Sequence, residues 1–478
     1  MKTIEGEYTD AKVLTTEVDE ACIDQITEMV NHEAFTNPVK IMPDAHAGAG
    51  AVIGFTMPLG EKVVPNTVGV DIGCGMAAAK FPRTEDLIQR LEVHLDEVDN
   101  MIQDNVPMGH HVYGDDDLPP QRYSMEKHFP WGECERKLKE FNDNQDDLFV
   151  ENPGYGMNYF KNLCLDVEYS FDRAENSIGT LGGGNHFIEI AYSEESGHPW
   201  VVIHSGSRGL GSEIAETWQK IAHQHCNNAP EQIRNFLSDY PDDYYHFNLK
   251  DSDMQILDWV RGEKNADWKN MEVVAQEHSG EEIERTRVEL EEGVRSVLDE
   301  NKESELDYLE GDLIKEYIVD MIFAQTYAKE NRREMIRRIA CILNEEPIER
   351  FDSIHNYIDF QDSIIRKGAT PARKGERALI PFNMADGSVI IEGKGNSEWN
   401  NSAPHGAGRR GSRGWARQTF SMEEFEESMD GVYSTSVSEA TLDEVPMAYK
   451  EKNSILSRLP ETAEVVDTLT PILNIKAQ

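Results

Sequence analysis

Apolar residues recur at helical spacing in three stretches of the chain. The first is 84–102, where leucine, valine and isoleucine side chains stand three or four residues apart. The second is 316–343, a longer stretch with one apolar side. The third follows Ser212, whose hydroxyl is a favourable N-cap for a helix that carries apolar residues as far as Ile221. The pattern therefore predicts helices in these three places.

Short apolar runs beside glycine and proline predict buried strands that end in tight turns. They fill most of the first 80 residues, return in LGGGNHFIEIAY and PWVVIHSGSRGLG, and appear again over 353–420. Residues 104–160 are polar and predict irregular structure. The mixture of strands and helices predicts an α/β fold. We expect one compact domain over 1–478, with a central mixed β core and a metal cleft formed by loops.

The stretch at approximately 240–310 has a different character. Between Glu281 and Asp312 it contains 13 acidic and 4 basic residues and few aromatic ones. Such a composition is typical of an exposed helix covered with charges. We therefore expect an acidic helical insertion within the domain. An arm that binds a specific partner is the alternative that the pattern leaves open.

The formal net charge of −43 at pH 7 argues, taken alone, against binding to nucleic acid. The charge is unevenly distributed, because ten basic residues stand against four acidic ones from Arg366 to Arg417, a net charge of +6. A basic segment on an acidic body can form a local groove for phosphates. The candidates for contacts with RNA are Arg366, Lys367, Arg373, Lys374, Arg409, Arg410 and Arg413.

The six cysteines are widely separated and form no CxxC pair, which argues against a disulfide framework and a structural zinc finger. No run of about 18 apolar residues is present, so we expect no transmembrane helix and no membrane partner. The N-terminal sequence MKTIEGEYTD lacks the apolar region of a secretory signal. These features predict a cytoplasmic protein.

Six short segments, five of them rich in glycine, each carry side chains of the kinds that bind metals or act as nucleophiles. Glycine lets the backbone approach a ligand closely, and loops that follow buried strands are common locations of sites. One histidine beside glycine would be weak evidence, but several in one chain indicate a site. The segments are PDAHAGAG (Asp44, His46), VDIGCG (Asp71, Cys74), GGGNHFIE (Asn185, His186, Glu189), VIHSGSRG (His204), SIHNYID (His355, Asn356) and PHGAGRRGSR (His405).

The kinds of ligand limit the kinds of metal. A thiolate, three imidazoles and a carboxylate suit zinc, manganese, iron or cobalt. One cysteine with dispersed histidines does not match a closed structural zinc site, so an open catalytic site is favoured. A thiolate can bridge two metals. Cys74 is therefore a candidate to hold a pair about 3.5–4 Å apart, the separation found in two-metal phosphoryl-transfer sites.

The motifs PDAHAG, GVDIGCG, GGGNHFIE, HSGSRG, HN, RKGAT, HGAGR and AYK, with a terminal IK, resemble in this order the tRNA-splicing ligase RtcB family. The resemblance covers nearly the whole chain apart from the acidic segment. It implies a GTP- and Mn²⁺-dependent ligase that joins RNA 3′-phosphate or 2′,3′-cyclic phosphate ends to 5′-hydroxyl ends, in tRNA splicing or RNA repair. The implied partner is RNA and not DNA, and an archease-type activator stays open.

The resemblance also implies roles for individual residues. His405 is implied as the nucleophile that takes GMP, and Asp44 as the group that orients its ring. One manganese is implied at Asp71, Cys74 and His186, and a second at Cys74, His204 and His355. The implied nucleotide contacts are Asn185, Glu189, Asn356, Pro381, Phe382, Asn383, Met384, Ser388, Ala407, Gly408, Tyr449 and Lys476.

The chemistry of the side chains agrees with these roles. A histidine can attack phosphorus to give a covalent intermediate, and a carboxylate on its other ring nitrogen sets the tautomer. The chain has no K-x-D-G motif, the lysine nucleophile pattern of ordinary nucleotidyl-transferase ligases, and no P-loop. If it activates RNA ends, it must use another nucleophile.

One turn departs from the family, which has Pro-Gly-Ser-Met-Gly where this chain has Pro381 to Ala385. Phe382 in place of glycine adds bulk beside the nucleotide, which bears on nucleotide preference and not on the metals. Two other functions stay open. One is a manganese-dependent RNA phosphodiesterase or phosphatase without ligation, and the other is a non-catalytic RNA-binding scaffold. A covalent GMP adduct would distinguish the ligase from both.

Overall fold

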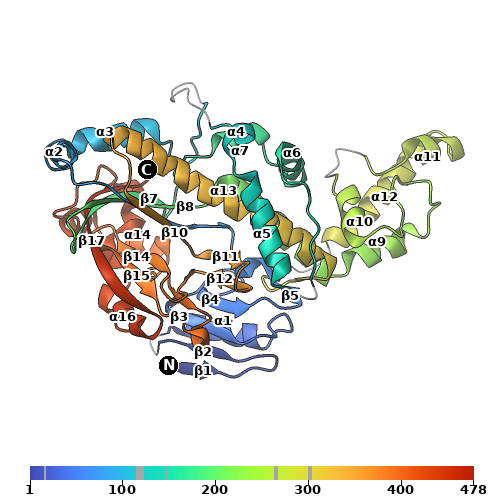
Figure 1. The fold of residues 1–478 in the computed structure, drawn as a ribbon. Coiled ribbons are helices and arrows are strands. Elements are labelled where there is room, and N and C mark those ends of the chain that lie inside the picture. Colours follow the sequence, from blue (N-terminus) through green and yellow to red (C-terminus); the bar gives the residue numbers. More distant parts are fainter. Residues whose placement is uncertain (16–17, 115–122, 146–147, 263–266, 300–303, 478) are drawn as a thin grey trace.

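The computed structural model describes residues 1–15, 18–114, 123–145, 148–262, 267–299 and 304–477. Within them, two β-sheets form the centre of the molecule and helices pack around them (Figure 1). The larger sheet has seven strands that are all antiparallel to their neighbours. In order across the sheet these are β10 (Glu349–Ile354), β6 (Gly75–Lys80), β8 (Pro199–Ser205), β7 (Phe187–Ser193), β17 (Ala463–Ile475), β15 (Gly387–Gly393) and β14 (Arg377–Asn383).

The smaller sheet has six described strands and is mixed, because β2 and β3 run parallel while its other neighbours are antiparallel. Its order is β1 (Lys2–Ile4), β2 (Ala11–Val13), β3 (Val39–His46), β4 (Ile53–Pro58), β12 (Ile364–Lys367) and β11 (Asn356–Asp359). Two short pairs complete the strands: β13 (Ala369–Pro371) with β16 (Ser402–Pro404), and β5 (Lys62–Val63) with β9 (Leu309–Glu310). The predicted mixed α/β fold with a central β core is confirmed.

The centre of the larger sheet is covered on both faces. Every residue of β8 is buried, as a continuous apolar run predicts. Apolar residues of α2 (Glu85–Val93), α3 (Leu95–Asn105) and α13 (Asp312–Leu343) pack on one face of the sheet. A separate cluster that includes Trp200 and Phe187 fills the other face. Because the sheet is held from both sides, the ends of its strands have fixed positions.

The longest described helix, α13 (Asp312–Leu343), packs against β6, β8 and β11. The predicted helix at 316–343 is confirmed, with four more residues at its start. It ends at Asn344, which adopts the left-handed conformation typical of a helix C-cap. With 32 residues it is about 48 Å long, so it crosses the body of the molecule (Figure 1).

The other helices differ from the prediction in several places. The predicted helix over 84–102 is two helices, because His94 has a non-helical backbone (φ −124°, ψ 35°). Ser212 is not an N-cap, since its helix begins four residues earlier. Helices also lie where strands or irregular structure were expected. The bounds are α1 (Glu20–Val30), α2 (Glu85–Val93), α3 (Leu95–Asn105), α4 (Met125–His128), α5 (Trp131–Asp143), α6 (Met157–Asp166), α7 (Phe171–Asn176), α8 (Arg208–Cys226), α14 (Arg413–Thr419), α15 (Met422–Ser428) and α16 (Lys452–Leu456).

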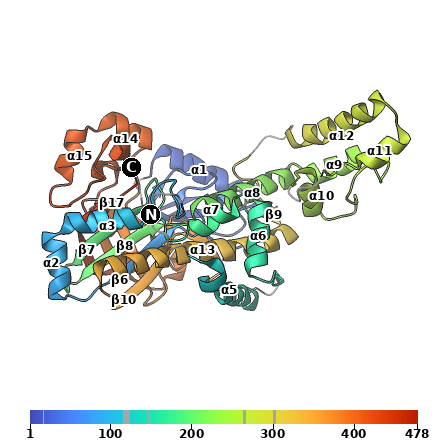
Figure 2. The same ribbon diagram turned by 90° about the horizontal axis from the view of Figure 1, so that it is seen from above.

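A helical arm, residues 229–262 and 267–299, projects from one end of the molecule (Figures 1 and 2). It contains α9 (Ala229–Leu237), α10 (Asp253–Val260), α11 (Met271–Glu277) and α12 (Glu281–Asp299). The arm has its own hydrophobic cluster, built around Trp268 and Phe247. The sequence prediction of a charged surface segment at 240–310 missed this aromatic core. The arm joins the body where the backbone N–H of Tyr308 donates to Cys226 Sγ over 3.2 Å.

No helix in the described part of the chain combines the length and the hydrophobicity needed to cross a membrane.

Candidate active site

Four of the predicted metal ligands lie at neighbouring strand ends of the larger sheet. His355 directly follows β10, Cys74 directly precedes β6, His204 is the last residue but one of β8, and His186 directly precedes β7. The register places Gly75 opposite both Ile354 and Ser205, and Phe187 opposite His204. Antiparallel pairing therefore brings four segments that are far apart in the sequence to one edge of the sheet.

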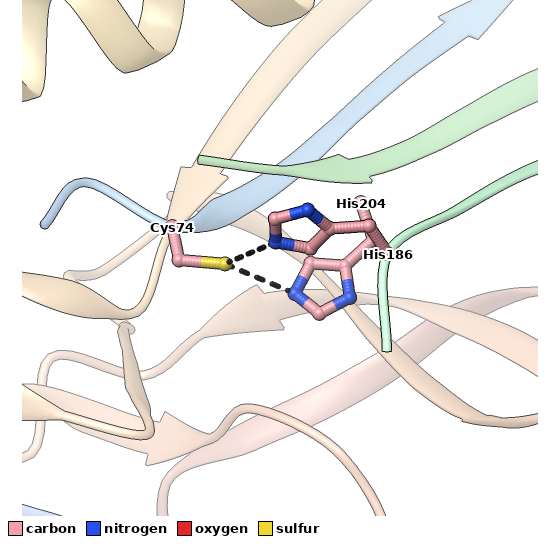
Figure 3. Close-up of side chains that lie close together, drawn as sticks. All are labelled: Cys74, His186 and His204. Atoms are coloured by element: carbon pink, nitrogen blue, oxygen red, sulfur yellow. Dashed lines mark hydrogen bonds between the residues drawn. The ribbon is translucent and has the colours of Figure 1, made fainter. Parts of the chain in front are cut away.

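The ligand atoms are in contact. Cys74 Sγ lies 3.5 Å from Nε2 of His186 and 3.3 Å from Nε2 of His204 (Figure 3). On one side of the thiol, His186 Nε2 lies 2.9 Å from Asp71 Oδ2. On the other side, His204 Nε2 lies 3.3 Å from His355 Nε2. The five predicted ligands thus form one continuous cluster with Cys74 at its centre.

The electrostatics of the cluster suit a cation. Burial and the neighbouring histidines lower the pKa values of His204 and His355 far below the ordinary range, so both imidazoles are neutral and keep a lone pair. Burial and the charge of Asp71 raise the pKa of the Cys74 thiol. Burial would raise the pKa of Asp71 as well, but the hydrogen bond and charge of His186 outweigh it and lower the pKa to about 2. A metal ion would favour the thiolate over the thiol.

His405 lies beside this cluster. It follows β16, and its ring centroid is 4.9 Å from that of His355. Asp44 belongs to β3 and is fully buried. Its Oδ2 lies 2.7 Å from His405 Nδ1 and accepts the backbone N–H groups of His405 (3.0 Å) and Gly406 (3.2 Å). Since the carboxylate holds the proton on Nδ1, the lone pair of the ring is on Nε2.

A cavity of about 130 Å³ opens over His405 and the cluster. Nine of the predicted nucleotide contacts line it: Asn185, Pro381, Phe382, Asn383, Met384, Ala407, Gly408, Tyr449 and Lys476. Gly408 has φ +72°, and a Cβ there would lie 2.4 Å from the carbonyl oxygen of Asp44. Only glycine fits this close approach, which gives the cavity its backbone wall.

The three other predicted contacts lie behind this wall. Asn356 Oδ1 accepts the backbone N–H of Gly368 (2.9 Å), so its side chain holds a turn. Ser388 pairs with Pro381 of the cavity wall, and Glu189 accepts a hydrogen bond from the cavity residue Asn474 (3.1 Å). Ser388 Oγ and Glu189 Oε1 are buried and have no partner in the described structure. Unsatisfied buried polar atoms are rare in folded proteins, and these two belong to residues that pair with the cavity residues Pro381 and Asn474.

Glu444 was missed by the sequence analysis. It is buried, and its carboxylate contacts Tyr449 Oη (2.6 Å), Lys476 Nζ (2.8 Å), Arg409 Nη1 (3.1 Å) and Arg413 Nη1 (3.3 Å). Burial would raise its pKa, but the charge of Lys476 and hydrogen bonds lower it to about 2. Its position shortly before the AYK motif was the only sequence signal. Glu444 fixes the cationic side of the cavity.

Two other candidates from the sequence, His46 and Phe382, make contacts inside the fold as well as lining the cavity. His46 lines the cavity but does not join the described metal-ligand cluster, and its Nδ1 lies 3.0 Å from the backbone oxygen of Asp44. Burial lowers the pKa of His46 to about 4. Phe382 lines the cavity and also belongs to a hydrophobic cluster with Ala403 and Ile455, so its side chain is 2% exposed.

The prediction that Arg366 and Lys367 contact RNA is wrong, while that for the partly exposed Arg373 stays a prediction. Arg366 is fully buried and pairs with Asp359, which also pairs with Arg373. Lys367 is buried and donates to backbone oxygens within the fold. Sheet pairing brings these cations to acceptors inside the body. Of the basic residues in this segment, Arg409 and Arg413 line the cavity, while Lys374 and Arg410 are exposed.

The comparison with protein families decides the identity of this site. A family model described as tRNA-splicing ligase RtcB matches residues 25–477. The chain belongs to the RtcB family. The RNA-splicing ligase RtcB of Escherichia coli K12 is 27% identical to it, over 92% of this chain and 90% of that protein. The tRNA-splicing ligases RtcB of Aeropyrum pernix and Nanoarchaeum equitans are 25% and 24% identical, over 87% and 91% of this chain and 82% and 87% of those proteins.

Membership of the RtcB family places the chain among RNA ligases, as its motifs predicted. The matched range, residues 25–477, includes the helical arm as well as the body. Every ligand, nucleophile and nucleotide position discussed above lies inside the matched range.

Proposed function

We propose that this RtcB protein joins RNA 3′-phosphate or 2′,3′-cyclic phosphate ends to 5′-hydroxyl ends, with GTP as co-substrate, two Mn²⁺ ions and a covalent GMP on His405. The observation that carries the proposal is the contact of His405 with the metal-ligand cluster, 4.9 Å between its ring and that of His355. A nucleophile with a fixed tautomer thus lies next to groups that bind cations.

The donor set fits two metal ions. Asp71, Cys74 and His186 would hold one ion, and Cys74, His204 and His355 would hold the second, with the thiolate shared. One thiolate, three imidazoles and one carboxylate suit a divalent transition metal, and manganese is the ion that we propose. When bound, the ions would neutralise charge on the phosphoryl group and on the leaving pyrophosphate.

His405 would act in the first step. Asp44 holds the proton on Nδ1, so Nε2 attacks the α-phosphorus of GTP, a P–N bond forms and pyrophosphate leaves. The negative charge of Asp44 stabilises the positive charge that develops on the ring. Lys476 and Arg409, both fixed by Glu444, lie on the cavity wall where they can contact phosphates or the nucleotide.

Two transfers would complete the reaction. An oxygen of the RNA 3′-phosphate attacks the GMP phosphorus, the P–N bond breaks and His405 returns to its free state. The 5′-hydroxyl of the second RNA end then attacks the activated 3′-phosphorus, a phosphodiester forms and GMP leaves. A 2′,3′-cyclic phosphate would first be opened by water. The cavity residues Asn185, Tyr449 and Lys476 support nucleotide binding next to His405.

The biological setting is part of the proposal. We propose RNA as the macromolecular substrate in tRNA splicing or RNA repair, without DNA or membrane partners, in the cytoplasm. An archease-type activator is compatible with this function. The rival functions, an RNA phosphodiesterase or phosphatase and an RNA-binding scaffold, need neither a reactive His405 nor its contact with Asp44.

Incubation with α-³²P-labelled GTP and Mn²⁺, followed by denaturing electrophoresis, tests the proposal. A labelled protein band that is stable to alkali and labile to acid is expected for a histidine phosphoramidate. The same protein should then join a 3′-phosphate RNA to a 5′-hydroxyl RNA. Turnover of RNA ends without a labelled band would favour the hydrolase, and no reaction with any RNA end would favour the scaffold.

A further inference from the structure

The middle of α13 lies directly under the metal-ligand cluster. Two consecutive polar residues of this helix, Asn331 and Arg332, are fully buried there. Neither belongs to a motif that the sequence analysis singled out. Burial of a guanidinium is costly unless all of its donors find partners. The hydrogen-bond partners of Asn331 and Arg332 indicate the role of the two residues.

Arg332 connects three of the segments that carry ligands. Its Nη1 donates to the backbone oxygens of Gly73 (2.7 Å) and Ser205 (2.8 Å), the neighbours of Cys74 and His204. Its Nε and Nη2 donate to the two carboxylate oxygens of Asp352, each over 2.7 Å. Asp352 lies in β10, the strand that leads to His355.

Asn331 extends the network to the fourth segment. Its Oδ1 accepts the backbone N–H groups of Gly179 (2.7 Å) and Thr180 (3.1 Å), and its Nδ2 donates to Ser205 Oγ (3.1 Å). Ser205 Oγ in turn donates to the backbone oxygen of Leu181 (2.8 Å). The same oxygen lies 3.0 Å from Nδ1 of His186, so it fixes the ring whose Nε2 faces Cys74.

The loop of Cys74 also rests on α13 itself. Gly73 has φ +72°, and a Cβ there would lie 2.8 Å from the Cβ of Ala328 and 3.0 Å from the Cα of Gln325. The backbone of the loop therefore touches the helix without space for a side chain. Contact with the helix and hydrogen bonds to Arg332 together fix the position of the Cys74 thiol.

We propose that Asn331 and Arg332 are positioning residues that hold the ligands of the two proposed metals in one geometry; this rests on the proposed function. Four ligands come from four separate segments, and each segment is tied to one point of a rigid helix. Arginine is required, because its planar fork reaches two carbonyl oxygens and a carboxylate at once. The single ammonium of lysine lacks this geometry. Outer partners of metal ligands commonly change metal affinity 10- to 100-fold.

The test compares Arg332→Lys with Arg366→Lys. Both residues are fully buried arginines that pair with an aspartate, but the side chain of Arg366 makes no described hydrogen bond to a residue adjacent to a proposed ligand. Mn²⁺ affinity is measured by isothermal titration calorimetry, and Co²⁺ is used for absorption spectra that report thiolate coordination. We expect Arg332→Lys to bind Mn²⁺ at least about tenfold more weakly and to alter the cobalt spectrum. Arg366→Lys should lose stability while its metal affinity stays at the wild-type value.

Asn331→Asp provides a second variant, because it keeps the acceptor Oδ1 and the shape of the side chain but loses the Nδ2 donor. It should weaken Mn²⁺ binding as well, even if Arg332→Lys does not fold. Wild-type Mn²⁺ affinity and cobalt spectrum in both folded variants, or in Asn331→Asp alone if the other does not fold, would overturn the inference. If the wild-type protein itself binds no Mn²⁺, the proposed function fails first, and the two failures are thus distinguishable.

Discussion

Asp44 and His405 are 361 positions apart in the sequence, yet one carboxylate oxygen of Asp44 contacts both the ring and the backbone of His405. The ring contact is 2.7 Å and the backbone contact is 3.0 Å. Because the same oxygen fixes the main chain and the tautomer, the direction of Nε2 is set before any substrate binds. Such preorganisation reduces the cost of reaching a reactive geometry.

The first prediction concerns the nucleophile. His405→Ala removes the only nitrogen that we propose to bond to GMP, so the acid-labile GMP adduct should disappear. Metal content should stay near normal, because His405 is not among the proposed ligands. Labelling with GTP and metal analysis of the same preparation check both statements. A labelled adduct in this variant would exclude His405 as the site of guanylylation.

The second prediction concerns the orienting carboxylate. Asp44→Asn keeps the size of the side chain but removes the charge that stabilises the ring during attack. A hydrogen bond to a charged group contributes about 1.5–3 kcal/mol. We therefore expect the rate of adduct formation to fall about tenfold to a hundredfold, with metal binding unchanged. Rapid-quench measurement with labelled GTP gives this rate, and an unaltered rate would show that Asp44 has only a structural role.

The third prediction concerns the shared thiolate. Cys74→Ala removes the atom at the centre of the cluster, so both metals should bind more weakly. The stoichiometry should fall well below two Mn²⁺ per chain. His186→Ala and His355→Ala should each weaken the binding of mainly one metal, since the two histidines lie on opposite sides of Cys74. Elemental analysis after dialysis compares the three variants. Full double occupancy in Cys74→Ala would contradict a bridging role.

The fourth prediction concerns pH. Burial raises the pKa of Glu189 to about 8, against 4.5 for the ordinary group. Between these values the folded protein keeps a proton that the unfolded chain releases, so stability falls as pH rises, by up to about 1.4 kcal/mol per pH unit. Glu189→Gln should not show this loss and should be more stable than the wild type at pH 8. Urea unfolding of both proteins at pH 5.5 and pH 8 measures the difference; parallel pH dependences would refute it.

The fifth prediction concerns the altered turn. Phe382 lines the cavity with a ring that is 2% exposed, and the ammonium of Lys452 lies 5.3 Å from its centre. Phe382→Gly with Asn383→Ser should change the ratio of adduct formed with GTP to that with ATP by at least about tenfold, roughly 1.4 kcal/mol. Both nucleotides are tested side by side on both proteins, after thermal unfolding has shown that the variant is folded. An unchanged ratio would mean that the ring does not affect nucleotide choice.

The side chains proposed from the sequence as metal ligands lie together in the structure, and all but His355 stand in a glycine-rich turn next to an apolar run. Local patterns of this kind can be recognised in the sequence without knowledge of long-range contacts. The helix over 316–343 was predictable for the same reason, since its apolar side is continuous. By contrast, the break at His94 leaves the apolar spacing of its neighbours intact, so periodicity alone did not reveal it.

Long-range pairing explains the failures at charged residues. Arg366 and Asp359 meet because β11 and β12 pair, and nothing in the local composition distinguishes such an arginine from one on the surface. Glu444 similarly looks like one more acid in an acidic chain. Only the fold shows that it gathers Lys476, Arg409 and Arg413 at the cavity.

The helical arm leaves and rejoins the body at nearly one point, where Cys226 and Tyr308 are linked by a hydrogen bond. Its hydrophobic cluster is separate from that of the body, although Met254 of α10 packs against the body's core. A segment attached in this way can be lengthened, exchanged or deleted while the path of the remaining chain stays the same. The arm is therefore attached like an insertion, and changes in its length or surface need not alter the geometry of the body.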